Sequence, residues 1–95
     1  ASLAASNSSR ASFAEANLTD AMMRSGLFAG ADFSGANLRG AKVGFASFEG
    51  AILNGADMRC HGLADAALTG AIADSKTLWP EGFDPMKYGV IVDWS

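Results

Sequence analysis

The chain has 95 residues, a formal net charge of −3 and a single cysteine, Cys60. A compact domain of this length would bury only a modest core, which favours a stacked repeat that builds one continuous core. The acidic balance argues against direct binding to nucleic-acid phosphates. The lone thiol excludes an intramolecular disulfide, and no apolar run approaches the roughly 20 residues that span a bilayer.

A five-residue pattern runs without insertion or loss from position 1 to position 75. The typical unit has a small residue, a short polar residue, a large apolar centre, a polar residue and a corner residue that is often glycine. The small position holds Ala, Ser or Gly in every unit except the one with His61. The centres are Leu3, Ser8, Phe13, Leu18, Met23, Phe28, Phe33, Leu38, Val43, Phe48, Leu53, Met58, Leu63, Leu68 and Ala73. Ala1 already fills the first position of a unit, so we expect a processed or trimmed product.

A period of five matches neither an α-helix nor a simple strand. It fits an extended three-residue segment followed by a turn, with the small position and the centre on the same side of the chain. All twelve charged residues between positions 1 and 75 avoid these two positions, although they make up two positions in five. Because burying an unpaired charge is costly, the pattern predicts a genuine interior.

Four segments lie closest to a known motif of Ala, Asp or Asn, Leu or Phe, a polar residue and Gly. They are residues 16–19, 31–35, 36–40 and 56–59. On these residues the chain resembles the pentapeptide-repeat family. The resemblance implies an all-β fold, a right-handed quadrilateral β-helix with four units to a coil. Residues twenty apart should then stack, and fifteen units make just under four coils.

We expect one domain, with the β-helix over residues 1–75 and a capping segment over residues 76–95. The first ten residues are degenerate, because Ser6 and Ser8 fill inward positions. This end is frayed, capped by residues outside the sequence, or covered by a partner. The residues after position 75 include many large apolar side chains, which could cover the exposed apolar side chains and strand edges of the last coil. Within this segment we expect Leu78 to be the centre of a sixteenth, distorted unit. The predicted cap residues are Leu78, Trp79, Phe83, Tyr88 and Trp94.

The segment from Trp79 to Pro85 reads Trp-Pro-Glu-Gly-Phe-Asp-Pro. It is similar to the closing segment of many pentapeptide-repeat proteins from cyanobacteria and plastids. This resemblance implies a photosynthetic source, with the chloroplast thylakoid lumen or its cyanobacterial equivalent as the expected location.

Cys60 and His61 are the one departure from the repeat pattern that could indicate a chemical site. A metal or redox site is the first reading, but no second Cys or His exists to complete a tetrahedral site. The second is a locally distorted coil relieved by Gly62. Inward residues assemble neither a nucleophile with its base nor an acid–base pair, so we expect no catalysis, no cofactor and no metal. The recurrent glycines are corner residues and do not form a phosphate loop.

Five apolar residues stand where the motif prefers a polar or corner residue: Met22, Leu27, Phe45, Ile52 and Ile72. Ile52 and Ile72 should share a column, while Met22, Leu27 and Phe45 should gather at the edge between the first two faces. Contiguous exposed apolar surface marks interaction sites. The alternatives are scattered surface residues, or residues covered by the returning tail.

Two functions are compatible with these patterns. The favoured one is a noncatalytic structural or protein-interaction module, a peripheral subunit of a photosynthetic membrane assembly that binds a protein partner and no nucleic acid. The alternative, implied by another branch of the family, is a DNA-mimicking gyrase-binding protein. Mimicry needs a long acidic rod, whereas four coils span only about 19 Å at the sheet spacing. The cations that interrupt the acidic faces are Arg24, Arg39, Lys42 and Arg59.

Overall fold

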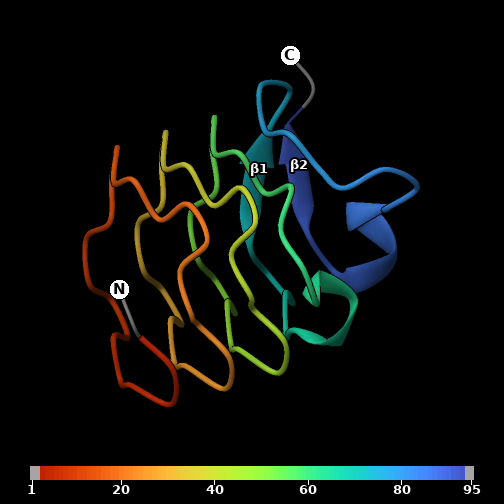
Figure 1. Cartoon of the computed structure of the whole chain (residues 1–95). Coiled ribbons are helices and arrows are strands. Elements are labelled where there is room, and N and C mark those ends of the chain that lie inside the picture. Colours follow the sequence, from red (N-terminus) through yellow and green to blue (C-terminus); the bar gives the residue numbers. More distant parts are fainter. Residues whose placement is uncertain (1–2, 94–95) are drawn as a thin grey trace.

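The computed structural model describes residues 3–93, which wind into a stack of similar turns running from the N-terminal to the C-terminal end (Figure 1). Parallel bridges join neighbouring turns, for example Asn7 to Leu27 and Leu27 to Ser47. These partners are twenty residues apart, so the predicted stacking is confirmed for these turns. The regular elements within the described residues are the 3₁₀ helix η1 (Leu63–Asp65), strand β1 (Ile72–Asp74), the 3₁₀ helix η2 (Pro85–Tyr88) and strand β2 (Ile91–Asp93).

Backbone hydrogen bonds join each unit to the neighbouring turns and also close the corner within its own turn, as the unit around Phe33 illustrates. The Phe33 amide donates to the Ile52 carbonyl of the next turn at 2.8 Å, and the Asp32 amide donates to the Ala11 carbonyl of the preceding turn at 3.0 Å. The Ala36 amide donates to the Phe33 carbonyl at 2.9 Å and closes the corner. Because the backbone groups find partners in this way, a three-residue extended segment is stable without a long strand.

The interior is apolar along the stack, and its largest members are phenylalanines. Phe28, Phe33 and Phe48 have no exposed surface. Phe13 stacks on Phe33 with ring centroids 5.0 Å apart, Phe28 stacks on Phe48 at 5.4 Å, and Phe28 meets Phe33 edge to face at 5.7 Å. Each fully buried ring contributes about 1.5 to 3 kcal/mol, so this ladder carries much of the stability. Among the described residues no charged side chain is buried, which confirms the inward assignment.

The first turn is bonded like the later ones in its described part. The Leu3 amide donates to the Met22 carbonyl at 2.7 Å, and the Ser8 amide donates to the Leu27 carbonyl at the same distance. The Ser6 hydroxyl donates to the Leu3 carbonyl at 2.7 Å and lies 3.4 Å from the Ser8 hydroxyl. The two inward serines therefore satisfy their hydroxyls locally, and the turn forms despite its weaker apolar packing.

One turn departs from the predicted register at Cys60 and His61. His61 bridges Lys42, and this bridge spans nineteen residues instead of twenty. The Cys60 amide donates to the Met58 carbonyl at 2.8 Å, so the corner is one residue shorter than the others. The prediction that His61 fills an inward small position is therefore wrong. Cys60 is buried there, and His61 is exposed.

The residue lost at this corner is regained immediately afterwards. Gly62 adopts a left-handed backbone with φ 85°, and η1 follows it. The normal spacing then returns, because Ser47 bridges Ala67 twenty residues on. A distorted coil relieved by Gly62 was the second of the two interpretations, and the structure confirms it. The shift admits a small thiol to the core and leaves the larger imidazole in solvent.

A second shift follows β1 and corrects the expectation for Leu78. Leu78 bridges Asp57 at a separation of twenty-one residues and is 46% exposed, so it lies outward and is not a centre. Thr77 takes the inward small position, where its hydroxyl donates to the Leu53 carbonyl at 2.8 Å. Trp79, which follows Leu78, is half-buried and packs against the core.

The tail returns to the stack through η2 and β2, which lies beside β1 in Figure 1. Trp79 stacks on Phe83 at 5.6 Å, and Phe83 stacks on Tyr88 at 4.7 Å. β2 pairs in parallel with β1, placing Ile91 opposite Ile72. The tail therefore adds a further rung to the stack. The remaining predicted cap residue, Trp94, lies outside the described residues.

Candidate functional site

The apolar residues predicted to face outward are accessible in the structure. Those at least 40% exposed are Met22, Leu27, Phe45 and Ile72, and Ile52 is half-buried. Met22 and Leu27 precede and follow the corner at Ser25 in one turn. The Ser25 amide donates to the Gly44 carbonyl at 3.0 Å, so Phe45 occupies the equivalent corner of the next turn. Met22, Leu27 and Phe45 therefore lie around the edge formed by the stacked corners at Ser25 and Phe45.

Phe45 has an unusual backbone for an aromatic residue. Its φ is 60°, in the left-handed region that the corner glycines also adopt, and its side chain is 64% exposed. The other non-glycine corners with positive φ are Ala5, Arg10, Glu15, Asp20 and Ser25. Left-handed geometry crowds the Cβ against the neighbouring carbonyl, and for a bulky residue it is an outlier. Phe45 is therefore held in a strained conformation that its own packing does little to offset.

Phe45 borders a hollow of about 200 Å³ on the outer surface. The floor is backbone, because a Cβ on Gly62 would lie only 2.8 Å from the Gly44 nitrogen. The side chains around it are those of Arg24, Lys42, Phe45, His61 and Asp65. The hollow exists because the one-residue shift brings Gly62 against Gly44 and turns His61 outward.

The hollow is rich in cationic groups that are not already paired. Within residues 3–93 the ion pair that forms is Arg59 with Asp57, and neither Arg24 nor Lys42 has a carboxylate within ion-pair distance. The Arg24 Nε lies 3.7 Å from the position that a Cβ on Gly44 would take, which places the guanidinium close to the backbone floor at Gly44. Asp65 is the acidic residue on the rim.

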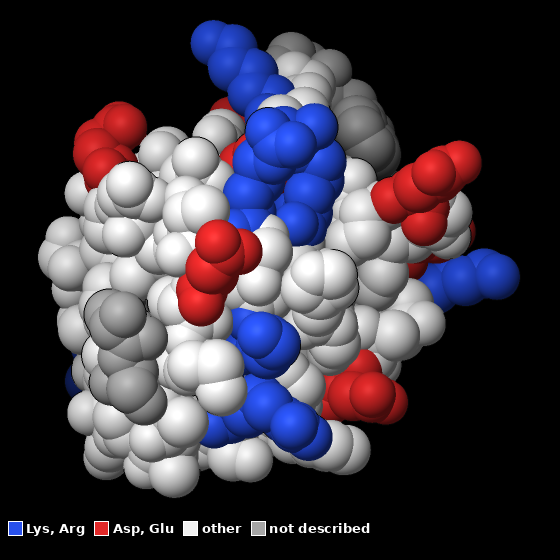
Figure 2. All heavy atoms as spheres, viewed as in Figure 1, with Lys and Arg blue, Asp and Glu red and all other residues white. Residues whose placement is uncertain are grey.

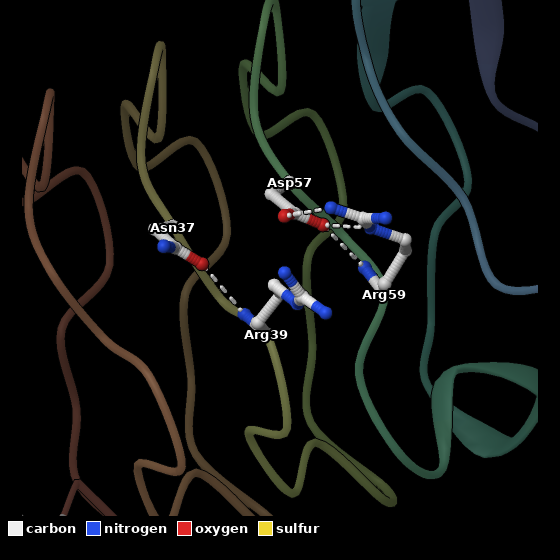
Figure 3. A network of polar contacts seen from close by, with 4 residues as sticks. All are labelled: Asn37, Arg39, Asp57 and Arg59. Carbon is white, nitrogen blue, oxygen red and sulfur yellow. Dashed lines mark hydrogen bonds and ion pairs between the residues drawn. The ribbon is translucent and has the colours of Figure 1, made fainter.

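Two arginines occupy equivalent positions in neighbouring turns and differ in their partners (Figure 3). Arg59 donates to Asp57 from Nε at 2.9 Å and from a terminal nitrogen at 2.8 Å. This hydrogen bonding holds the pKa of Asp57 below its usual value and raises the pKa of Arg59. Asn37 replaces the carboxylate in the other turn and accepts only from the Arg39 amide, at 3.0 Å. The Arg39 guanidinium therefore forms no ion pair within the described residues, although its charge also helps to lower the pKa of Asp57.

These cations gather on two adjoining sides of a molecule whose net charge is negative, with the Asp20 carboxylate at the Gly40 corner between them. Four of the seven Lys and Arg residues, Arg24, Arg39, Lys42 and Arg59, lie on the two sides that meet at the Gly40 corner. Figure 2 shows Lys and Arg side chains gathered down the middle of one face. The clustering is a product of the fold, because these four residues are spread over positions 24 to 59 of the sequence.

The second apolar group is a column of isoleucines. Ile52 bridges Ile72, and Ile72 pairs with Ile91 in the β1–β2 sheet. Ile91 is 62% exposed, so the tail lengthens this column and leaves Ile72 accessible. The repeat pattern predicted that Ile52 and Ile72 share a column. It did not predict that Ile91 joins them, because the alignment of β2 with β1 depends on how the tail folds back.

Cys60 lies at the edge of a second hollow, of about 390 Å³, between η1 and the tail. Burial raises the pKa of its thiol to about 12, so the thiolate needed for nucleophilic or redox chemistry is disfavoured at neutral pH. His61 points to the other side of the chain and joins the first hollow. The adjacent pair therefore does not act as one site.

Residues 3–93 contain no group of three or more His, Cys, Asp or Glu side chains placed to hold a metal ion. No helix over the same residues has the length and apolar character required to cross a membrane.

Comparisons with known proteins agree with the repeat pattern. Residues 31–60 match a family model described as pentapeptide repeats. The crystal structure of alr5209, a pentapeptide repeat protein from Nostoc PCC 7120, aligns with 97% of this chain and 80% of its own, at 29% identity and a TM-score of 0.62. No curated protein matches the sequence.

HetL, a pentapeptide repeat protein of the same cyanobacterium involved in heterocyst differentiation regulation, has a similar fold. It aligns with 97% of this chain at 24% identity and a TM-score of 0.59, and this chain spans 48% of its length. At that identity the likeness shows the fold alone. The match over residues 31–60 and the similarity to alr5209 show that the chain carries pentapeptide repeats, as these cyanobacterial neighbours do, and such repeats form a right-handed β-helix.

Proposed function

We propose that this chain is a noncatalytic protein-interaction module and that it serves as a peripheral subunit of a photosynthetic membrane assembly. The observation that carries the proposal is the isoleucine column, in which Ile72 and Ile91 are exposed and Ile52 is half-buried. Ile52 and Ile72 stand where the repeat motif prefers Asp or Asn. Pentapeptide-repeat proteins are often interaction modules. Contiguous exposed apolar surface on a small protein is a usual mark of an interface.

The proposed setting is the chloroplast thylakoid lumen or its cyanobacterial equivalent. Its support is the closing segment from Trp79 to Pro85 and the similarity to a Nostoc protein. We also propose that residues 1–75 form just under four coils and that residues 76–95 cap them within one domain. The stacking of Trp79, Phe83 and Tyr88 and the pairing of β2 with β1 support this division.

The DNA-mimic alternative has less support. The body measures 33 × 24 × 20 Å, which is short for a rod that imitates a duplex. Its cations gather on one face, where a mimic of the phosphate backbone needs continuous negative charge.

The test is to express the tagged chain in a cyanobacterium, isolate thylakoid membranes and identify the proteins that co-purify. An Ile72→Ser/Ile91→Ser double variant should lose those proteins, whereas Leu78→Ser, at an exposed residue outside the isoleucine column, should keep them. Circular dichroism of each variant checks that the fold is retained. Unchanged recovery of the same proteins with the double variant would refute the proposal.

A further inference from the structure

The hollow beside Phe45 has a size that restricts its occupant. Small-molecule and cofactor sites usually measure about 300 to 1,000 Å³, whereas this hollow holds about 200 Å³. It is open to the surface and has a backbone floor at Gly44 and Gly62. A space of this kind suits one side chain of a docked partner better than a free cofactor.

The charges around the hollow select an anionic side chain. Arg24 and Lys42 contribute two positive charges and Asp65 one negative charge, which leaves a formal charge of +1 before His61 is considered. Neither cation is paired within the described residues. Guanidinium and ammonium groups present several N–H donors, and charge-assisted bonds to a carboxylate are roughly twice as strong as neutral ones.

Residues next to the hollow can contact further residues of the partner. Met22 bridges Lys42 and is 40% exposed, and Phe45 forms an apolar wall of the same hollow. On the other side of the Gly40 corner, Arg39 offers a further guanidinium that forms no ion pair within the described residues, with Asp20 on the same surface. Apolar contacts therefore lie next to cationic ones on the same surface.

We propose that this hollow docks an acidic segment of a protein partner, with one carboxylate held between Arg24 and Lys42 and an adjacent apolar side chain packed on Phe45. The inference rests on the proposed interaction function and names the chemistry of the partner at a surface separate from the isoleucine column. Complementary charge across an interface mainly increases specificity and the association rate, which suits a small module that must find one partner. The strained exposure of Phe45 is consistent with its use as an apolar anchor.

The probe for the test is a fluorescein-labelled peptide of alternating glutamate and leucine residues, with a glutamine-for-glutamate peptide as its uncharged analogue. Anisotropy is measured at low ionic strength, where exposed charges are least screened. The purified chain should bind the acidic peptide, and the glutamine peptide should bind at least about tenfold more weakly. Amide resonances of Gly44, Phe45, His61 and Gly62 should shift on titration with the acidic peptide.

The matched variants separate a local effect from net charge. Arg24→Glu/Lys42→Glu and Lys76→Glu/Lys87→Glu change the net charge equally, and all four positions are exposed. The first pair should lose at least about tenfold in affinity, and the second should retain it. Equal loss in both pairs, equal binding of the glutamine peptide, or full competition by inorganic phosphate at the peptide's own concentration would overturn the proposal. If peptide binding fails while the Ile72→Ser/Ile91→Ser variant still loses its native partners, the interaction function stands and this inference alone is wrong.

Discussion

Phe45 combines an unfavourable backbone with little burial. Its corner position requires positive φ, which glycine adopts without steric cost, yet a phenylalanine occupies it and leaves most of its ring in solvent. Neither backbone geometry nor packing accounts for the choice, which supports the proposed docking role of Phe45. Strain of this kind is found where a site needs a particular side chain in a particular place.

Phe45→Gly should therefore stabilise the protein while weakening its binding. Relief of the left-handed strain is expected to add about 1 kcal/mol to the free energy of unfolding, measured by denaturant titration. Affinity for the acidic peptide should fall in parallel. A variant that is less stable than the parent would show that the ring contributes more to packing than its exposure indicates.

Cys60 provides a second test at the scale of one residue, because burial raises the pKa of its thiol to about 12 from a usual value of 9.0. A raised folded pKa means that stability is fully present below the unfolded pKa and is lost as pH rises toward the folded one. Stability should therefore decline between about pH 9 and pH 12. Cys60→Ala, which restores the usual residue of the small position, should reduce that decline. Equal alkaline loss in both proteins would contradict the burial of the thiol.

At the scale of an element, the segment from Met58 through η1 redistributes residues between two neighbouring corners. The first corner is short and the second is long, so the overall count of 75 residues in fifteen units hides a local slip. Gly62 makes the slip possible in two ways, by its φ of 85° and by its contact with Gly44. The same slip creates the hollow, so the irregularity of the repeat and the candidate site have one structural origin.

Gly62→Ala should destabilise the protein more than Gly50→Ala. Both glycines have positive φ and so share the backbone cost of about 1 to 2 kcal/mol. A Cβ at Gly62 would lie 2.8 Å from the Gly44 nitrogen, whereas a Cβ at Gly50 meets nothing within 4 Å. The extra loss at Gly62 should be about 1 to 3 kcal/mol, measured by thermal or chemical denaturation. Equal losses would mean that the contact between the two turns is looser than the structure indicates.

At the scale of the whole molecule, stability depends on a core shared by every turn. The stacked rings of Phe13, Phe28, Phe33 and Phe48 connect several turns directly, and none of these turns encloses a core by itself. Repeat proteins gain stability from such contacts between neighbours. The effect of a core substitution is therefore expected to spread through the stack.

Phe33→Asp should unfold the protein. Loss of a buried Phe costs about 3 to 5 kcal/mol even when alanine replaces it, a buried carboxylate adds a further penalty, and total stabilities are only about 5 to 15 kcal/mol. Phe33→Leu is the control and should remain folded, because it adds no charge and removes fewer buried atoms than a change to alanine. Far-ultraviolet circular dichroism distinguishes the two, and a well-folded Phe33→Asp variant would disprove the inward assignment.

Much of the fold could be predicted because the repeat is local. The alternation of extended residues and turns, repeated every five positions, determines which side chains face inward, and the placement of Phe33 or Lys42 follows from it. Two predictions failed, at His61 and at Leu78, and for the same reason. At both places the chain slips by one residue so that Cys60 or Thr77 can enter a small inward position. A count of residues cannot detect such a slip.

The sequence by itself therefore determined the period, the interior and the exposed positions of Met22, Leu27, Phe45 and Ile72, since these depend on backbone geometry within a few residues. Only the tertiary structure decided which side chains from different turns meet. The hollow between Phe45 and His61 depends on a compensated slip, and the addition of Ile91 to its column depends on the docking of the tail. Both are settled by packing between segments distant in the chain, which a local repeat does not specify.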